Sequence, residues 1–265
     1  MSVSQLISKS TVRIECDVVG GGVSVGTGFW FAFSTSENSG IPLLVTNKHV
    51  IANSTAVRIR LNVSSSTDPN LKFYDVIIDL PSDFIHHPNP NVDICALPVT
   101  SFLMTLRSQG IEVDNFFFTD EYFRNRQYVT PVEEVFMIGY PNGLWDSVNN
   151  RPIIRKGITA SSLLESWQGR PEFMIDMACF GGSSGSPVFI MNDGGFPTSN
   201  GWAIGNRFIF LGLLYAGPTL DVNGSINIVD VPTVATPVVS TTLMMNLGMV
   251  IKAEQLNGLR PLLGI

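Results

Sequence analysis

Charged side chains are scarce in this sequence, and basic residues are not in excess. Of 265 residues, 14% are charged, and 16 basic residues stand against 22 acidic ones, for a formal net charge of −6. This balance argues against a general nucleic-acid-binding surface. The apolar run at 208–216 is too short to span a bilayer. The N-terminus lacks a charged segment followed by an apolar one. We therefore expect a cytoplasmic protein with no membrane or nucleic-acid partner.

Histidine and cysteine are also rare. Any step that needs an imidazole must use one of three histidines, which are His49, His86 and His87. No Cys-x-x-Cys motif or Cys/His ligand spacing is present. We therefore expect no metal site, and we expect three reduced, mostly buried thiols at Cys16, Cys95 and Cys179.

What the chain does contain is apolar sequence divided into short runs. Hydrophobic residues make up 45% of it, which excludes a disordered chain. Runs of β-branched and aromatic residues alternate with Gly, Pro, Asn and Ser, a pattern typical of strands and turns. We expect strands at 11–19, 28–33, 43–46, 56–62, 73–80, 92–97, 134–139, 153–161, 172–177, 187–191, 208–215, 226–231 and 248–252. Only the tail after residue 252 has helical spacing. Two sets of strands joined by a polar connector predict two small β-barrels or one large sandwich.

Three local clusters contain residues that could perform chemistry. His49 follows an apolar strand, Asp93 lies within an apolar run, and Ser184 lies in a Gly/Ser turn. Taken singly, His49 and Ser184 are more often structural residues than catalytic ones. Asp93 is harder to dismiss, because a carboxylate in an apolar run needs a partner, and a histidine is a natural one.

Together the clusters match the requirements of acyl transfer. A hydroxyl nucleophile (Ser184) needs a base to accept its proton (His49) and an acid to orient that base (Asp93). The glycines before the serine allow a turn that points consecutive N–H groups inward. We expect the N–H groups of Gly182 and Ser184 to form an oxyanion hole.

An esterase of the α/β-hydrolase type is one alternative. Residues 181–185 match the Gly-x-Ser-x-Gly elbow, with Ser183 as the nucleophile. In that fold the acid and then the histidine follow the serine. No histidine follows Ser184, so this hypothesis fails.

Metal-dependent hydrolysis and a cysteine nucleophile are weaker alternatives. His86 and His87 are adjacent, so on a strand their side chains would point to opposite faces and could not easily share one ion with Asp83 or Asp93. Cys179 precedes the glycine turn instead of occupying it, and it is better explained as a core residue.

The chain resembles the chymotrypsin/trypsin-like serine peptidases, particularly the bacterial intracellular kind. The resemblance rests on GTGFWF (26–31), TNKHVI (46–51), NVDICAL (91–97), IGYPNG (138–143), RKGITAS (155–161), GGSSGSPVF (181–189) and LGLLYAG (211–217). It implies an all-β fold of two six-stranded antiparallel barrels. The first barrel would span 1–104, a connector 105–130, the second barrel 131–252 and a C-terminal helix 253–265. It also implies a serine endopeptidase that needs no cofactor and acts on a protein or peptide substrate.

The chain departs from this family at two functionally important points. Relatives activated by cleavage carry an Asp before the nucleophile, whereas here the residue is Ser183. By the same resemblance, the specificity pocket is lined by Ala178, Cys179, Leu214, Ala216, Gly217 and Gly248. Because these residues are uncharged, we expect a preference for an apolar or small P1 side chain.

Two questions stay open at this level. The segment 218–247 is longer than the family leads us to expect, and it could form a loop over the cleft, a docking surface or a plain surface excursion. The fold could also serve as a catalytically silent or effector-gated binding module. Because an unregulated cytoplasmic protease would be dangerous, we expect a regulatory protein partner or a narrow choice of substrate.

Overall fold

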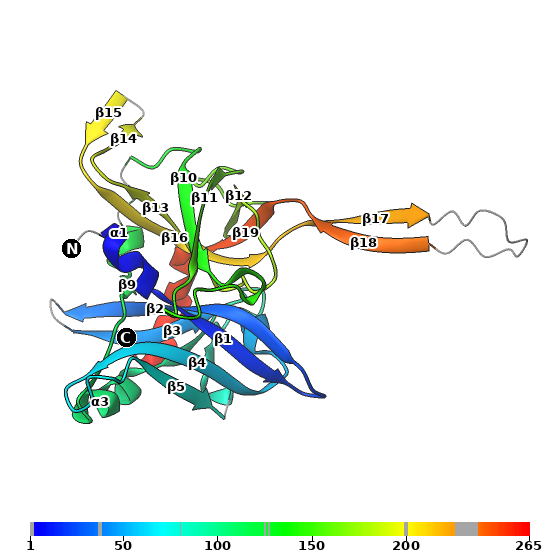
Figure 1. Ribbon diagram of the computed structural model, residues 1–265. Helices are drawn as coiled ribbons and strands as arrows, with labels where there is room; N and C mark the ends of the chain where they lie inside the picture. The colour runs from blue at the N-terminus through cyan, green and yellow to red at the C-terminus, as the bar shows by residue number, and fades with distance from the viewer. Residues whose placement is uncertain are drawn as a thin grey trace, which may run out of the picture.

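Strands dominate the computed structural model, which describes all residues except 1–2, 37–38, 80, 125, 127, 199–200 and 226–237 (Figure 1). The strands of the first half are β1 (Thr11–Val18), β2 (Val23–Ser36), β3 (Ser39–Thr46), β4 (Ser54–Ser65), β5 (Phe73–Ile78), β6 (Ile85–His86), β7 (Cys95–Pro98), β8 (Ile111–Val113) and β9 (Phe118–Thr119). Those of the second half are β10 (Glu134–Gly139), β11 (Ile153–Thr159), β12 (Glu172–Asp176), β13 (Pro187–Asn192), β14 (Gly195–Thr198), β15 (Gly201–Ile204), β16 (Arg207–Ala216), β17 (Thr219–Ser225), β18 (Val238–Met244) and β19 (Leu247–Lys252).

Helices are short. They are α1 (Val3–Leu6), α2 (Lys48–Ile51), α3 (Thr100–Ser108), α4 (Glu121–Arg124) and the 3-10 helices η1 (Ile7–Lys9), η2 (Pro81–Asp83), η3 (Pro141–Gly143) and η4 (Ala253–Leu263). The tail is therefore helical as expected, but of the 3-10 type. The helix packs closely against His87 at Gly258, where a Cβ would lie 2.1 Å from His87 Nε2.

The second half forms a closed six-stranded barrel in the order β10-β11-β12-β19-β16-β13. The first half forms a nine-stranded sheet with the path β5-β4-β1-β2-β3-β7-β6, to which β8 and β9 add at β4 and β2. No pairing among the described residues closes that path. The all-β class and one barrel are therefore confirmed, whereas the first barrel and the domain boundaries stay predictions.

An aromatic core joins the two halves. Phe29 and Phe118 from the first half pack against Phe189 and Phe210 from the second, and all four are fully buried. The rings of Phe118 and Phe210 lie 4.8 Å apart. The two sets of strands thus share one hydrophobic core, which holds the loops between them in a defined geometry.

Two sequence-based expectations need correction, and a third stays a prediction. The stretch 92–97 is not one strand, because β7 begins only at Cys95, and Asp93 lies in the irregular segment before it. Helical structure is not confined to the tail, because the nine-residue helix α3 begins in the range expected for the first barrel and runs into the polar connector, and its apolar Phe102, Leu103 and Leu106 have helical spacing. The strand expected at 226–231 lies outside the described residues.

The segment 218–247 starts and ends as a hairpin. β17 and β18 pair antiparallel from Thr219↔Met244 to Ser225↔Val238 and project away from the body of the protein (Figure 1). The described strands therefore do not lie against the barrels as a covering loop would.

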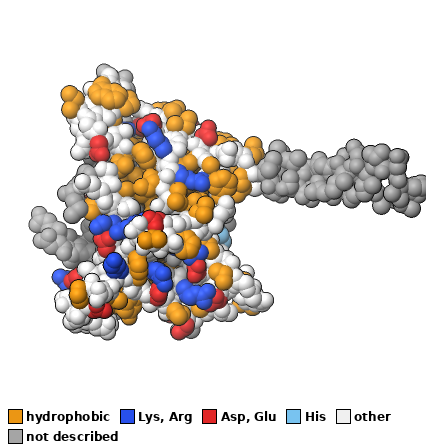
Figure 2. Space-filling model, in the orientation of Figure 1, with side chains coloured by type: hydrophobic (Ala, Val, Ile, Leu, Met, Phe, Trp, Pro, Cys, Tyr) orange, Lys and Arg blue, Asp and Glu red, His pale blue; other side chains and the backbone are white. Residues whose placement is uncertain are grey.

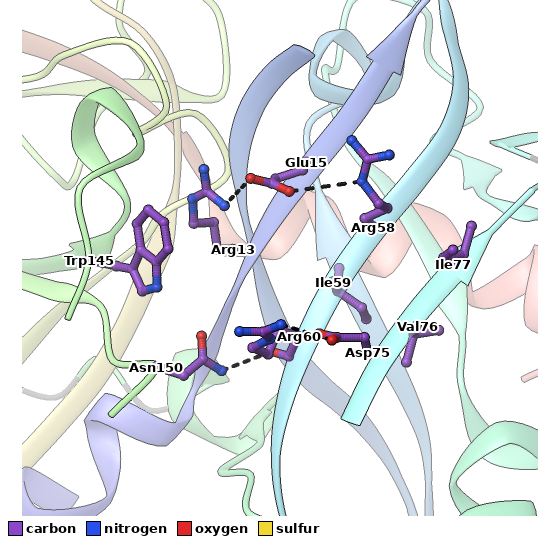
Figure 3. A pocket seen from close by; sticks show the side chains of 10 residues that line it. All are labelled: Arg13, Glu15, Arg58, Ile59, Arg60, Asp75, Val76, Ile77, Trp145 and Asn150. Carbon is purple, nitrogen blue, oxygen red and sulfur yellow. Dashed lines mark hydrogen bonds and ion pairs between the residues drawn. The ribbon is translucent and has the colours of Figure 1, made fainter. Parts of the chain in front are cut away.

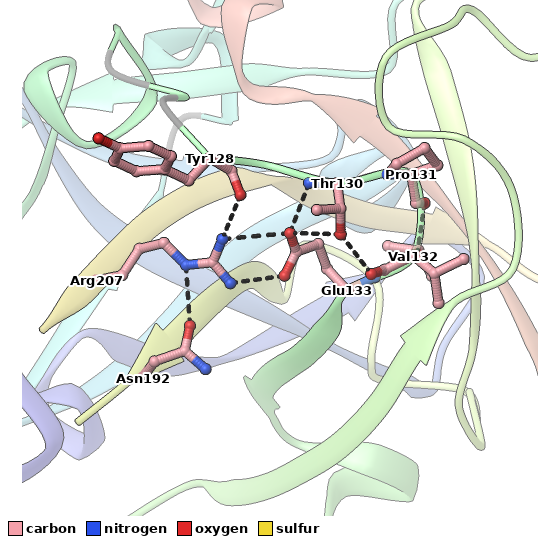
Figure 4. Close-up of polar contacts among 8 residues, drawn as sticks. Tyr128, Thr130, Pro131, Val132, Glu133, Asn192 and Arg207 are labelled. Carbon is pink, nitrogen blue, oxygen red and sulfur yellow. Dashed lines mark hydrogen bonds and ion pairs between the residues drawn. The ribbon is translucent and has the colours of Figure 1, made fainter. Parts of the chain in front are cut away.

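A buried ion pair fastens the end of the connector to the second barrel (Figure 4). Arg207 Nη2 lies 2.6 Å from Glu133 Oε2, and the two side chains are 6% and 3% exposed. Arg207 also donates to the Tyr128 carbonyl and to Asn192 Oδ1, while the N–H of Thr130 donates to Glu133. The pair is satisfied on both sides, as burial of charge requires.

Breaking this pair should destabilise the fold strongly. Arg207→Met would leave the Glu133 carboxylate buried without its cation, which costs about 3–5 kcal/mol of unfolding free energy. Urea denaturation measures the loss. Lys156→Met is the matched control, because Lys156 pairs with Glu134 at the surface, where such a pair contributes about 0–1 kcal/mol. Equal losses in the two variants would contradict the structural role of the buried pair.

Candidate active site

His49 and Asp93 are brought together at the edge of the first sheet. His49 lies in α2, directly after β3, and Asp93 lies just before β7, the neighbour of β3. Asp93 Oδ2 lies 2.5 Å from His49 Nδ1, and Asp93 Oδ1 accepts the backbone N–H of His49 at 3.1 Å. The buried Asn47 side chain donates to the Asp93 carbonyl at 2.7 Å. The carboxylate therefore holds both the ring and the backbone of His49.

These contacts keep Asp93 ionised. Burial raises the pKa of the carboxyl, but the hydrogen bond and charge of His49 and the N–H groups of His49 and Lys48 outweigh it, so the net pKa is below its usual value. The His49 side chain is 47% exposed. An ionised acid behind an accessible imidazole is the arrangement that fixes the tautomer of a general base.

Ser184 lies in a tight turn before β13. The N–H of Ser183 donates to the Phe180 carbonyl at 3.0 Å, and Gly182 has φ +80° at the position where a type II turn requires a positive φ. Gly185, with φ +86°, comes so close to β2 that a Cβ would lie 2.0 Å from the Thr27 carbonyl oxygen. Both positions require glycine.

Two amides of this turn are free to bind a ligand. Within the part of the chain that the structure describes, the N–H groups of Gly182 and Ser184 donate to no acceptor. The amides on either side of Ser184 are engaged, because the N–H of Ser183 donates to Phe180 and that of Gly185 to Leu214. Free amides at alternate positions of a turn are a suitable anion site.

The turn lies beside the end of β3. Thr27 links the two, since its N–H donates to the Ser184 carbonyl at 2.9 Å and its own carbonyl accepts the Thr46 hydroxyl at 2.7 Å. Thr46 is three residues before His49. Thr27 and Thr46 were not recognised as site residues from the sequence, although both lie in the motifs that carry the resemblance.

A family model described as a trypsin-like peptidase domain matches residues 26–196. The chain belongs to the trypsin-like peptidase family. Membership places it among the serine endopeptidases, which are hydrolases.

Several solved structures of proteases are similar to this family member. The active form of the Rv3671c protease from M. tuberculosis has a TM-score of 0.48 and 16% identity, over 98% of this chain and 82% of that one. An HtrA-type protease, AlgW, with a tripeptide has a TM-score of 0.46 and 14% identity, over 95% and 58%. A scabies mite inactivated protease paralogue has a TM-score of 0.46 and 10% identity, over 97% and 95%. No curated protein matches the chain.

Four of the residues predicted to line a specificity pocket lie together. A Cβ at Gly248 would lie 2.6 Å from both Cys179 Sγ and Leu214 Cδ1, and one at Gly217 would lie 3.8 Å from Cys179 Cβ. Ala216, by contrast, is exposed. Burial raises the pKa of the Cys179 thiol to about 11, so it stays protonated and is a poor nucleophile.

Arg155 is a neighbour of this region that the sequence did not single out. Its guanidinium donates to the Ala178 carbonyl and lies 4.8 Å from the centre of the Phe180 ring. The only sign in the sequence was its place in the RKGITAS segment. The charge is engaged by backbone and ring, so Arg155 braces the irregular segment that leads from β12 to the Ser184 turn.

A second set of residues near Asp93 was also missed. The Tyr215 hydroxyl donates to Glu172 at 2.9 Å, and burial together with Glu172 raises the Tyr215 pKa to about 12. Glu172, Arg170 and Val92, the residue before Asp93, line a hollow of about 460 Å³. Val92 thus connects the wall of this hollow to Asp93 along the chain.

The other two histidines stand apart from the site. His87 is buried against Gly258, and burial lowers its pKa. His86 lies in β6 and is exposed. Among the described residues, no group of three His, Cys, Asp or Glu side chains is arranged to hold a metal ion. No described helix is both long and apolar enough to cross a membrane.

Proposed function

We propose that the chain hydrolyses peptide bonds by acyl transfer through Ser184, His49 and Asp93. The observation that carries the proposal is the coexistence of an Asp93-held imidazole with a serine turn that has two unengaged amides. Each part performs one task that the reaction needs. No further group is required, so the reaction runs without a cofactor.

Ser184 Oγ attacks the scissile carbonyl while His49 Nε2 accepts its proton. Asp93 stabilises the resulting imidazolium, and the amides of Gly182 and Ser184 receive the charge that develops on the carbonyl oxygen. His49 then protonates the leaving amine. Water repeats the cycle on the acyl-enzyme and releases the acid.

Ser183 determines whether such an enzyme can be activated by cleavage of the chain. It is 1% exposed, and within the described residues its Oγ has no hydrogen-bond partner. A neutral side chain there cannot form an ion pair with a newly cut N-terminus. We propose that activity does not depend on that cleavage, and that a protein partner or narrow substrate choice restrains the enzyme in the cytoplasm.

The specificity pocket supports an apolar or small P1 preference. Cys179, Leu214 and Gly248 offer no charge, so a buried P1 cation or carboxylate would lack a partner. A P1-randomised peptide library, analysed by mass spectrometry, should show cleavage after residues such as Leu or Phe about tenfold or more over Arg, Lys or Glu.

The same library tests the peptidase activity itself, with Ser184→Ala as the control that should leave it uncut. Preferred cleavage after Arg or Lys would overturn the pocket assignment, and preferred cleavage after Glu would assign Arg155 to the pocket. No cleavage by the folded wild type would favour a binding module over an enzyme.

A further inference from the structure

A hollow of about 350 Å³ lies on the outer face of β1, β4 and β5, and none of the proposed catalytic residues lines it (Figure 3). Its walls combine charge and apolar surface. Arg13, Arg58 and Arg60 supply three guanidinium groups, Glu15 and Asp75 supply two carboxylates, and Trp145 and Ile77 supply apolar area. Basic and acidic side chains gather over this part of the molecule (Figure 2).

Strand register places two of the three cations, Arg13 and Arg60, side by side. β1 and β4 pair with Ile14 opposite Ile59 and Glu15 opposite Arg58, which makes Arg13 and Arg60 neighbours on the same face. Like charges in adjacent strands repel unless an anion lies between them. Arg60 and Arg58 each already bind a carboxylate through two nitrogens, Asp75 and Asp17 respectively.

Arg13 is the cation with donors to spare. It uses one nitrogen on Glu15, whereas its Nε is buried without any partner among the described residues. No described acceptor is recorded for its Nη2 either. The guanidinium stacks at 4.0 Å on the Trp145 ring, which fixes its plane. Beside it, Ile77 is 61% exposed and offers apolar contact.

We propose that this hollow binds a carboxylate that carries an apolar group, the chemistry of a peptide's C-terminal residue, and that occupancy is transmitted to the Ser184 turn. The carboxylate would pair with Arg13 and the apolar group would cover Ile77 and the edge of Trp145. The transmission rests on the proposed function, whereas the binding does not.

The segment from Pro141 to Arg151 supplies the physical connection. At one end Trp145 stacks on Arg13, and Asn150 donates to the Arg60 carbonyl. At the other end the N–H of Asn142 donates to the Gly181 carbonyl at 2.5 Å.

The backbone between these ends forms a tight turn that packs closely against the Ser184 turn. Asn142 and Gly143 have φ of +50° and +71°, which an Asn-Gly pair adopts readily, and a Cβ at Gly182 would lie 3.3 Å from the nitrogens of both. A shift of Trp145 would therefore reach the turn that presents the Gly182 and Ser184 amides.

Binding is tested on Ser184→Ala protein, so that catalysis is not involved. Calorimetric titration with N-acetyl-L-phenylalanine should give an affinity about tenfold or more above that for its neutral amide. Arg13→Gln in the same background should remove the difference, while Arg107→Gln, which changes an exposed cation on α3, should keep it. Binding that survives Arg13→Gln belongs to the specificity pocket and overturns the proposal. If Arg13→Gln does not fold by circular dichroism, Trp145→Ala replaces it, and unchanged affinity in that variant is equally decisive.

Transmission is tested on the wild-type enzyme by the rate of labelling with a fluorophosphonate. N-acetyl-L-phenylalanine at saturation should change this labelling rate about threefold or more, whereas its neutral amide should leave the rate unchanged. In Arg13→Gln the acid should no longer change the rate. If the acid still slows labelling in Arg13→Gln, it competes at Ser184, which contradicts transmission. A labelling rate that does not change although the acid binds contradicts transmission as well. Intact binding with no labelling at all would refute the proposed function and leave the binding site standing.

Discussion

Ser184→Ala is expected to lower kcat/KM for a peptide substrate by about 10⁴–10⁶-fold, because no other group can form the acyl-enzyme. Neighbouring nucleophiles cannot substitute. Ser183 points into the protein, where it is 1% exposed, and Cys179 is buried with its pKa raised to about 11. The measurement is turnover of a fluorogenic peptide together with mass spectrometry of the fluorophosphonate adduct.

Ser183→Ala is the matched control for this experiment. It removes the adjacent hydroxyl, which has no hydrogen-bond partner among the described residues, and should keep labelling and turnover within about tenfold of wild type, as expected for a side chain outside the reacting group. Labelling that persists in Ser184→Ala but is lost in Ser183→Ala would move the nucleophile to the other serine. It would also revive the Gly-x-Ser-x-Gly elbow.

Asp93→Asn is expected to cost about 10⁴-fold in kcat at neutral pH. Both carboxylate oxygens accept hydrogen bonds from His49, one from Nδ1 and one from the backbone N–H. An asparagine amide has a single acceptor oxygen, so its NH2 group would face either the backbone N–H or Nδ1–H of His49, and two donors would then oppose each other. The imidazole relieves the second conflict only by shifting to the tautomer with its proton on Nε2. That tautomer cannot accept the Ser184 proton. Turnover from pH 5 to 9 measures the loss, and Asp68→Asn, an exposed acid in a turn, is the control.

The pH profile separates this effect from simple destabilisation. Because the folded pKa of Asp93 is depressed, its stabilising contribution is present above the unfolded value near 3.9 and is lost only as the pH falls through the lower folded value. Wild-type enzyme should therefore show no Asp93-linked loss of stability between pH 5 and 8. An Asp93→Asn variant with near wild-type turnover and unchanged stability would refute the orienting role.

Apolar runs bounded by turn residues predicted the strands of the second barrel well. The strand expected at 134–139 has those bounds in the structure, and the other strands of the second barrel differ by a few residues. The local pattern gave a wrong prediction at Asp93, where apolar neighbours suggested a continuous strand. The backbone there turns instead, because its carbonyl and carboxylate are engaged by Asn47 and His49. That contact is long-range, and no local pattern contains it.

Other features needed the tertiary structure for the same reason. The glycines of the Ser184 turn suggested tight geometry, but only the fold shows that Thr27 and Thr46 join the turn to β3. Nothing in the sequence marks Arg155 or Arg13 as important. Their roles follow from contacts with aromatic rings, Arg155 with Phe180 and Arg13 with Trp145. Trp145 lies far from Arg13 along the chain.

The sequence by itself determined the all-β class, the membership of a peptidase family and the scarcity of histidine that leaves His49 as the usable base. These follow from composition and short motifs, which are properties of the chain. The tertiary structure decided which amides stay unengaged, which carboxylate holds the imidazole and where three arginines meet, because each of these depends on residues that only strand pairing and the shared core bring together.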